Sequence, residues 1–283
     1  MEVDKLYQGD CRTVLERFPD NSVDLIFTSP PYADNRRKSP YKGVKIEEYV
    51  EWFLPISNQL RRVLKPEGSF ILNMKERAVH GERQTYVLQL ILQMKEQGWY
   101  WIEEYIWHKK NCYPGKWPNR FRDAWERCLH FTKERKFKMY QKAVMVPMGK
   151  WMEKRLTSLS EKDHTRHESK VSSGLGRNVS NWVERKMAYP TNVLHLPTEC
   201  SNRNHSAAFP KELPMWFIRL FTEEGDIVLD PFIGSGTTAI ACLQTYRHFV
   251  GIEVQQEYYK IAIEAISMHI ERSRGMGDDQ SYK

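Results

Sequence analysis

The chain has 283 residues, and its 43 Lys and Arg against 36 Asp and Glu give a formal net charge of +7. Hydrophobic residues at 41% and aromatic residues at 12% suffice for a sizeable core and argue against wholesale disorder. No apolar run reaches the roughly 18 residues of a membrane span, and neither a signal-peptide pattern nor Cys-x-x-Cys spacing is present, so we expect a cytoplasmic protein without a metal site.

The first strand signal, over 22–27, ends abruptly at Thr28-Ser29-Pro30-Pro31-Tyr32. Two adjacent prolines exclude both helix and ladder pairing, so these residues predict a rigid, extended turn at the end of the strand. Helical spacing then runs over 46–64, with a kink expected at Pro55. Residues 65–68 predict a turn into the next strand.

The following elements keep the same alternation. In order, we expect a strand over 69–72, a helix over 82–97 that Gly98 ends, and strands over 99–107 and 127–131.

The last third of the chain alternates helices and strands regularly. The pattern predicts a helix over 211–222, a strand over 226–229, a helix over 237–244, a strand over 248–252 and a helix over 255–271. Strands that alternate with helices of this length indicate an α/β fold with a mostly parallel, doubly wound sheet.

The positive charge is concentrated in one internal stretch. Residues 133–186 carry 14 basic and 6 acidic residues, a net +8, which leaves the rest of the chain at −1. Such a concentration is typical of a surface that meets nucleic acid phosphates, and the alternative is a charged surface kept for solubility. The polar tract over 157–181 fits a flexible loop or one that orders on binding a partner.

A glycine-rich turn follows the strand over 226–229. In the run from Asp230 to Thr238, Gly234 and Gly236 allow a tight turn and close approach of a ligand to the backbone. Glu253 ends the next strand, 17 residues past Gly236, where an acid can accept hydrogen bonds from ribose hydroxyls. The turn predicts a nucleoside-containing cofactor and lacks the Gly-Lys-[Ser/Thr] of a phosphate-binding P-loop. The alternative is a turn that only packs helix on sheet.

The two turns together resemble motifs of the DNA methyltransferases that act on exocyclic amino groups. Ser29 to Tyr32 is similar to their motif IV, and Asp230 to Thr238 to their cofactor motif. The order of the motifs, with a basic region between them, matches the circularly permuted β class. Further segments that are similar to the family's are Gly9-Asp10, Asp24, 107–111, Glu126, Phe131 and 205–210.

The resemblance implies a Rossmann-like fold, S-adenosylmethionine as cofactor and double-stranded DNA as partner. It implies a catalytic domain in two parts, 1–132 and 189–283, with a target-recognition insert over 133–188. The Ser-Pro-Pro-Tyr form is the one associated with methylation of cytosine N4 rather than adenine N6. Such enzymes serve restriction–modification systems, so a restriction endonuclease is expected as a separate chain, and a homodimer is left open.

The chemistry of the Pro-Pro turn fits this resemblance. A pyrimidine amino group is planar and a poor nucleophile, and two acceptors on its hydrogens favour the pyramidal geometry needed to attack a sulfonium methyl. The side-chain oxygen of Ser29 and the carbonyl of Pro30, held rigid by Pro31, are suitable acceptors. Tyr32 offers a face for a flipped base. No cysteine follows a proline here, which disfavours methylation at cytosine carbon 5.

The cofactor residues follow from the resemblance. Asp10 would contact the adenosine, Glu253 the ribose and Thr237 the carboxylate of the cofactor. The turn itself would line it through Asp230, Phe232, Gly234, Ser235 and Gly236. Asp10 is also suited to cap a helix N-terminus, and both roles stay open.

Three alternatives remain at this point. Within the class, the target can be adenine N6, because the Ser/Asp distinction is a correlation. A nicotinamide-dependent oxidoreductase would explain Gly234 to Glu253 and leave Ser29 to Tyr32 unexplained. A non-catalytic DNA-binding protein would keep the motifs in a degenerate site.

Overall fold

The structure is a computed structural model that describes residues 1–33, 43–112, 118–149, 186–198 and 209–278, together with residues 115, 154, 157 and 158, and side chains up to 273. It divides into two compact units. The first comprises Met1–Tyr140 and Asn192–Lys283, and the second comprises Gln141–Thr191. Most of the polar tract over 157–181 lies outside the described residues, as do all of residues 205–208 of the family-like segment.

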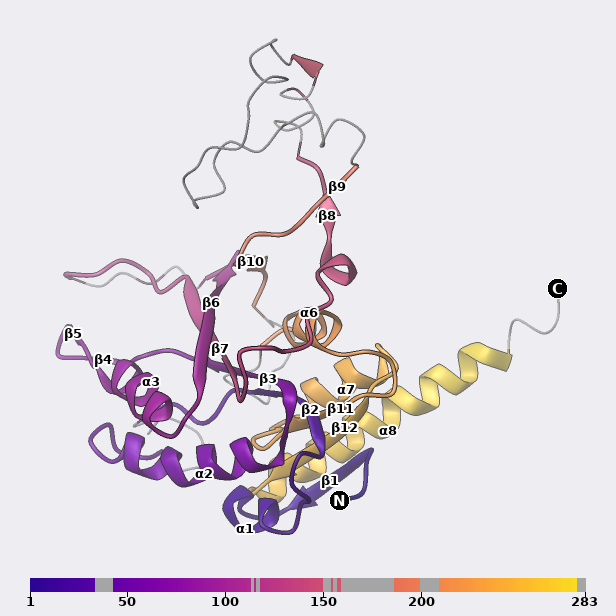
Figure 1. The fold of residues 1–283 in the computed structure, drawn as a ribbon, viewed down its shortest axis with the longest axis horizontal. Helices are drawn as coiled ribbons and strands as arrows, with labels where there is room; N and C mark the ends of the chain where they lie inside the picture. The colour runs from indigo at the N-terminus through magenta and orange to yellow at the C-terminus, as the bar shows by residue number, and fades with distance from the viewer. Residues whose placement is uncertain are drawn as a thin grey trace. The chain divides into compact units, whose positions relative to one another are not determined.

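The first unit is built on an eight-stranded sheet with the order β1-β12-β11-β2-β3-β7-β6-β10 (Figure 1). Its strands are β1 (Lys5–Gln8), β2 (Val23–Thr28), β3 (Leu64–Met74), β6 (Tyr100–Lys109), β7 (Trp125–Thr132), β10 (Val193–Leu196), β11 (Ile227–Asp230) and β12 (His248–Glu253).

The sheet is parallel except at β7, which runs antiparallel to both β3 and β6. The chain continues from β2 to β3 on one side of the parallel β11–β2 pair and from β11 to β12 on the other. The strand order therefore reverses between β11 and β2. In open parallel sheets, ligands bind at the carboxyl ends of the strands beside such a switch point. The arrangement confirms the predicted α/β fold with a mostly parallel, Rossmann-like sheet.

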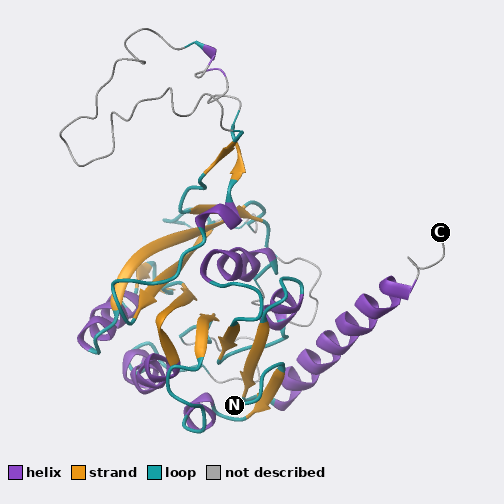
Figure 2. Ribbon diagram, turned by 45° about the vertical axis from the view of Figure 1, so that its right-hand side comes forward, coloured by secondary structure: helices purple, strands orange, loops and turns teal. Residues whose placement is uncertain are grey.

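Helices cover the two faces of the sheet (Figure 2). One layer contains α1 (Cys11–Leu15), α2 (Tyr49–Val63) and α3 (Tyr86–Glu96), and the other contains α6 (Glu212–Phe221), α7 (Thr237–Leu243) and α8 (Gln256–Asp278). The buried faces of α1, α2 and α3 form one apolar cluster with the central strands. All six residues of β2 are buried, as expected of a strand that is covered on both faces.

The helices and strands predicted from the sequence are present, with larger differences in bounds at four of them. The last helix, α8, runs to Asp278 rather than ending at 271. The helix predicted over 82–97 begins at Tyr86, because Glu82–Arg83 form β5, which pairs with β4 (Ala78–Val79) in a hairpin. Residues 65–68, predicted as a turn, belong to β3, and the register with β2 shifts between Val23 and Leu25. Pro55 lies inside α2, which begins at Tyr49.

Besides β4 and β5, three short elements of the first unit were not predicted. β1 and β10 have four residues each, and α1 has five, so none is long enough to show a clear hydrophobic period. Asp10 is the N-cap of α1, and its side chain accepts a hydrogen bond from the backbone N–H of Arg12. The capping role that the sequence left open is therefore present.

The second unit begins with a 3-10 turn, η1 (Gln141–Val144), followed by a short antiparallel pair, β8 (Val146–Pro147) and β9 (Met187–Ala188). Residues 133–140, which the sequence assigned to the insert over 133–188, belong to the first unit. There Lys138 N donates to Glu67 O and Tyr140 N donates to Leu220 O. A recognition role for the insert stays a prediction.

Among the described residues, no helix combines the length and the apolar character of a membrane span.

His130 on β7 is buried among aromatic rings and links stability to pH. It is 1% exposed, Nε2 lies 3.0 Å from Ser69 Oγ, and burial lowers its pKa to about 3. An unfolded histidine titrates near a pKa of about 6.5. The folded protein keeps His130 neutral, whereas the unfolded chain protonates it below about pH 6.5. The contribution of the neutral ring to the free energy of unfolding is therefore complete above about pH 6.5 and is lost as the pH falls below it.

We therefore predict that lowering the pH from 7 to 5 reduces the free energy of unfolding by about 2 kcal/mol more in the wild-type chain than in a His130→Gln variant, as measured by urea unfolding. A His269→Gln variant, altered on α8, serves as the control and should keep the wild-type pH dependence. Equal pH dependence in wild type and His130→Gln would contradict this account of the buried ring.

Candidate functional site

The residues singled out by the sequence gather at one edge of the sheet. Ser29 follows the carboxyl end of β2, Asp230 and Glu253 end β11 and β12, and Asp10 lies just beyond β1. β7 runs in the opposite direction, so its first residues, including Glu126, lie at this same edge. The strand order thus brings residues from both ends of the chain together.

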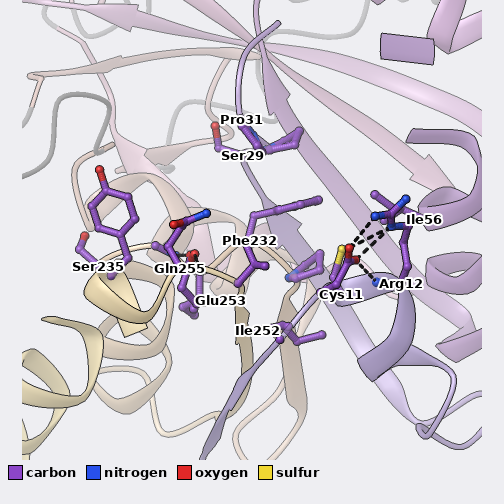
Figure 3. Close-up of a pocket in the computed structure, with 18 of the residues that line it drawn as sticks. Cys11, Arg12, Ser29, Pro31, Ile56, Phe232, Ser235, Ile252, Glu253 and Gln255 are labelled. Atoms are coloured by element: carbon purple, nitrogen blue, oxygen red, sulfur yellow. Dashed lines mark hydrogen bonds and ion pairs between the residues drawn. The ribbon is translucent and has the colours of Figure 1, made fainter. Parts of the chain in front are cut away.

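A cavity of about 290 Å³ lies at this edge. In Figure 3, Ser29 lies at its top, Phe232 at its centre, and Glu253 and Arg12 on opposite sides. Ten of the twelve predicted site residues line it, namely Asp10, Ser29, Pro30, Pro31, Tyr32, Phe232, Gly234, Ser235, Thr237 and Glu253. The Pro-Pro turn and the glycine turn therefore border one space.

The other two predicted residues, Asp230 and Gly236, support the cavity without lining it. Asp230 is 1% exposed, and its carboxylate accepts from Thr28 Oγ1 at 2.6 Å, Thr238 Oγ1 at 2.6 Å and Phe232 N at 3.0 Å. Gly236 has a φ of 88°, and a Cβ there would lie 3.3 Å from Ala262 Cβ. Both residues shape the loop that carries Phe232.

The buried carboxylate of Asp230 is costly to ionise. Burial raises its pKa to about 6; the hydrogen bonds from Thr238, Thr28 and the Phe232 N–H oppose the rise, and Glu253 adds to it. The folded pKa lies above the unfolded value of about 3.9, so ionisation at neutral pH lowers the stability of the fold. The hydrogen bonds, rather than the charge, are what Asp230 contributes to the site.

Glu253 presents a carboxylate to the cavity in a fixed orientation. Oε2 accepts from Gly234 N at 3.0 Å and Oε1 accepts from Gln255 N at 2.7 Å. Burial raises the pKa of Glu253, and these backbone hydrogen bonds oppose the rise. Each carboxylate oxygen has two acceptor positions, so one on each oxygen remains for a ligand with paired hydroxyls.

Asp10, on the other side of the cavity, has a partner that the sequence did not reveal. Besides capping α1, its carboxylate pairs with the guanidinium of Arg12, with Nη2 donating to Oδ2 at 2.6 Å and further contacts from Nε. The pair lowers the pKa of Asp10. Arg12 itself lines the cavity.

Two tyrosines hold the Pro-Pro turn. Tyr49 OH on α2 donates to Pro31 O at 3.0 Å. Tyr32 OH donates to Glu126 Oε2 on β7 at 2.6 Å. Burial, followed by the Glu126 carboxylate, raises the pKa of Tyr32 well above its usual value, while Ser29 opposes the rise. Tyr32 therefore keeps its proton.

Sequence reasoning missed the wall that α2 supplies. Trp52 and Ile56 line the cavity, and the ring of Trp52 lies 5.8 Å from that of Phe232. On the sequence both residues fit the apolar face of an ordinary core helix, so no signal distinguished them. Cys11 and Tyr258 also line the cavity and were not predicted as site residues.

The arrangement offers oxygen acceptors at Ser29 and Pro30, an aromatic face at Tyr32, and two carboxylates beside apolar rings. Among residues that the structure describes, no group of three or more His, Cys, Asp or Glu side chains could hold a metal ion.

Comparison with known proteins gives a consistent set of similarities. The family model described as DNA methylase (N6_N4_Mtase) matches residues 23–264. The Type II methyltransferase M.PvuII of Proteus hauseri is 31% identical over 274 residues, which is 89% of this chain and 80% of the relative.

Two solved structures are also similar. The PvuII DNA methyltransferase (cytosine-N4-specific) has a TM-score of 0.68 and 26% identity, covering 95% of this chain and 91% of that chain. The complex of M1.HpyAVI with SAM has a TM-score of 0.58 and 20% identity over 92% of this chain and 97% of that chain, which bears on the fold alone.

The role of Asp230 as a hydrogen-bond acceptor generates a prediction. Asp230→Ala leaves three buried donors without their acceptor and should lower the free energy of unfolding by about 3 kcal/mol at pH 7. Asp230→Asn keeps an acceptor and removes the buried charge, so it should be at least as stable as wild type. Urea unfolding measures both.

Matched substitutions at Asp20, whose side chain is 68% exposed, provide the control. There the Ala and Asn variants should differ little. If Asp230→Ala proved as stable as Asp230→Asn, the hydrogen bonds would not be the contribution of this residue.

Proposed function

The chain belongs to the DNA methylase family, and we propose that it transfers a methyl group from S-adenosylmethionine to the exocyclic N4 of a cytosine flipped out of double-stranded DNA. One observation carries the proposal. The turn from Ser29 to Tyr32 and the cofactor-type residues Phe232 and Glu253 border a single cavity. A methyl donor and an amino acceptor can therefore meet in it.

The lining of the cavity fits S-adenosylmethionine. Glu253 has acceptor positions for the two ribose hydroxyls, and Asp10, paired with Arg12 on the other side of the cavity, would contact the adenosine. Trp52 and Phe232 supply aromatic surface for the adenine. Ser235 and Thr237 offer hydroxyls to the carboxylate of the methionine moiety. When bound, the cofactor supplies an electrophilic methyl group on a sulfonium.

The residues of the Pro-Pro turn would act on the target amino group. Ser29 Oγ and the Pro30 carbonyl are acceptors for its two hydrogens, which would favour the pyramidal geometry that the nitrogen needs to bond the methyl carbon as the methyl–sulfur bond breaks. One of the two amino hydrogens would then be lost as a proton to water. Tyr49 fixes the backbone of this turn through Pro31 O. Tyr32 provides the stacking face for the flipped base. The rate then depends on orientation and proximity, without a covalent intermediate on the protein.

Two observations favour cytosine N4 over adenine N6. Position 29 is Ser rather than Asp, the form associated with N4 methylation, and the similar PvuII enzyme is described as cytosine-N4-specific. The family match also favours methyl transfer over the nicotinamide-dependent oxidoreductase that the glycine turn alone allowed. Adenine N6 is the second candidate, and the product decides between them.

Partners and setting follow from this proposal. The basic stretch over 133–186, with its net +8, would contact the DNA backbone and read sequence. The relative M.PvuII is named a Type II methyltransferase. This name supports a restriction–modification setting in the cytoplasm, with an endonuclease as a separate chain. Assembly as a homodimer belongs to the same proposal.

The first test identifies the product. Unmethylated genomic DNA treated with the protein and S-adenosylmethionine, then digested to nucleosides, should contain N4-methylcytosine by mass spectrometry. Ser29→Ala should lower the initial rate at least about tenfold, because it removes an acceptor that acts as the transition state forms. N6-methyladenine as the sole product would overturn the cytosine assignment.

A second test isolates the cofactor site. Glu253→Ala should raise the dissociation constant for S-adenosylmethionine by about 10- to 100-fold, because hydrogen bonds to a carboxylate are worth about 1.5–3 kcal/mol. Isothermal titration calorimetry measures it. Glu257→Ala, four residues along and exposed on α8, is the control and should bind as wild type. Unchanged binding by Glu253→Ala would contradict the assigned ribose contact.

A further inference from the structure

A partly buried ion pair lies behind the Pro-Pro turn. Tyr32 OH donates to Glu126 Oε2 at 2.6 Å, and Lys109 Nζ donates to Glu126 Oε1 at 2.5 Å. The three residues come from three different segments: the loop after β2, the start of β7 and the end of β6. Neither Glu126 nor Lys109 lines the cavity, so both act behind its wall.

The sheet fixes this pair in position. Glu126 lies opposite Trp107 in the β6–β7 ladder, and Lys109 N donates to Ala124 O just beyond it. The Lys109 ammonium also lies 5.0 Å from the centroid of the Trp107 ring, within cation–π range. Glu126 is 7% exposed, and the Lys109 side chain is 20% exposed. The carboxylate that meets Tyr32 therefore sits on a rigid support.

Stability alone does not explain the pair. The cost of removing two charges from water is often as large as their attraction, so an apolar pair of similar volume would stabilise the sheet equally well. A charged pair does provide an acceptor at a fixed point, which an apolar pair cannot. The acceptor is used by the Tyr32 phenol.

The hydrogen bond from Tyr32 to Glu126 restricts the part of the Pro-Pro turn that is still free to rotate, the Tyr32 ring. The two prolines restrict its backbone, and Tyr49 OH holds Pro31 O. The ring of Tyr32 would still rotate about its two side-chain torsions. Anchoring its hydroxyl on Glu126 fixes the ring three residues from Ser29.

We propose that Glu126, paired with Lys109, is a positioning residue that fixes the Tyr32 ring for stacking of the target base beside Ser29. The inference rests on the proposed function, since it assumes that a base is bound at this turn. Glu126 is not a general base in this account, because one of its oxygens is occupied by Tyr32 and the other by Lys109. The phenol, whose pKa is raised, stays protonated and continues to donate.

Two matched double variants test the proposal. Lys109→Met with Glu126→Gln removes both charges and keeps an oxygen acceptor for Tyr32. Lys109→Met with Glu126→Leu removes both charges and the acceptor. Both lack an unpaired buried charge, so each is expected to fold, which circular dichroism and thermal unfolding check.

The readout is the maximal rate of tritium transfer from labelled S-adenosylmethionine to unmethylated genomic DNA, with the cofactor dissociation constant measured separately. The variant with Gln should transfer within about threefold of wild type. The variant with Leu should lose about tenfold, as should Tyr32→Phe alone, which corresponds to one hydrogen bond of about 1.4 kcal/mol. All should bind the cofactor as wild type. When Tyr32→Phe is added to the Leu variant, the transfer rate should fall by less than about a further twofold.

The outcomes separate the explanations. Equal large losses in the Gln and Leu variants would overturn the inference in favour of a role for the charge itself. Unchanged rates in the Leu variant and in Tyr32→Phe would overturn it in favour of a purely structural pair. In both cases wild-type transfer to DNA leaves the proposed function standing, whereas a wild-type chain that binds the cofactor and transfers no methyl group overturns both.

Discussion

The hydrogen bond from Thr28 Oγ1 to Asp230 Oδ1 joins the two halves of the site, which lie 202 positions apart in the sequence. It forms at the carboxyl ends of β2 and β11, which pair in parallel at the centre of the sheet. The same carboxylate holds Phe232 N and Thr238 Oγ1, so the cofactor-type loop is tied directly to the strand that carries Ser29. The shared cavity depends on this alignment, because a shift between the two strands would separate the turns that border it.

The sheet order extends the same constraint to the chain ends. β1 pairs with β12, and Gly9 N donates to Glu253 O at 3.0 Å, so two acids from opposite ends of the sequence face one cavity. On the other side, the antiparallel β7 brings Glu126 to the edge where the parallel strands end. One edge of one sheet therefore carries the two acids that border the cavity, the Pro-Pro turn and the pair that holds Tyr32.

Much of this was predictable from local sequence. Adjacent prolines at 30 and 31 and the glycine turn at 234–236 restrict the backbone strongly, so their geometry could be inferred without tertiary information. Contacts between distant side chains could not. Arg12 on Asp10, Trp52 on Phe232 and Glu126 on Tyr32 each depend on strand register or on the rotation of a helix, which the hydrophobic pattern does not determine. For the same reason Asp230 was predicted as a cofactor ligand, whereas its carboxylate is buried on Thr28, Thr238 and the N–H of Phe232, and the residue does not line the cavity.

The central claim is that one cavity presents the methyl group of the cofactor to Ser29 and Pro30. A crystal structure of the protein with S-adenosylmethionine tests it most directly. The account predicts ribose hydroxyls on the Glu253 carboxylate, adenine beside Phe232 and Trp52, and the sulfonium methyl directed at Ser29 Oγ and the Pro30 carbonyl. A cofactor bound with its methyl group turned away from Ser29, or bound outside this cavity, would contradict the account.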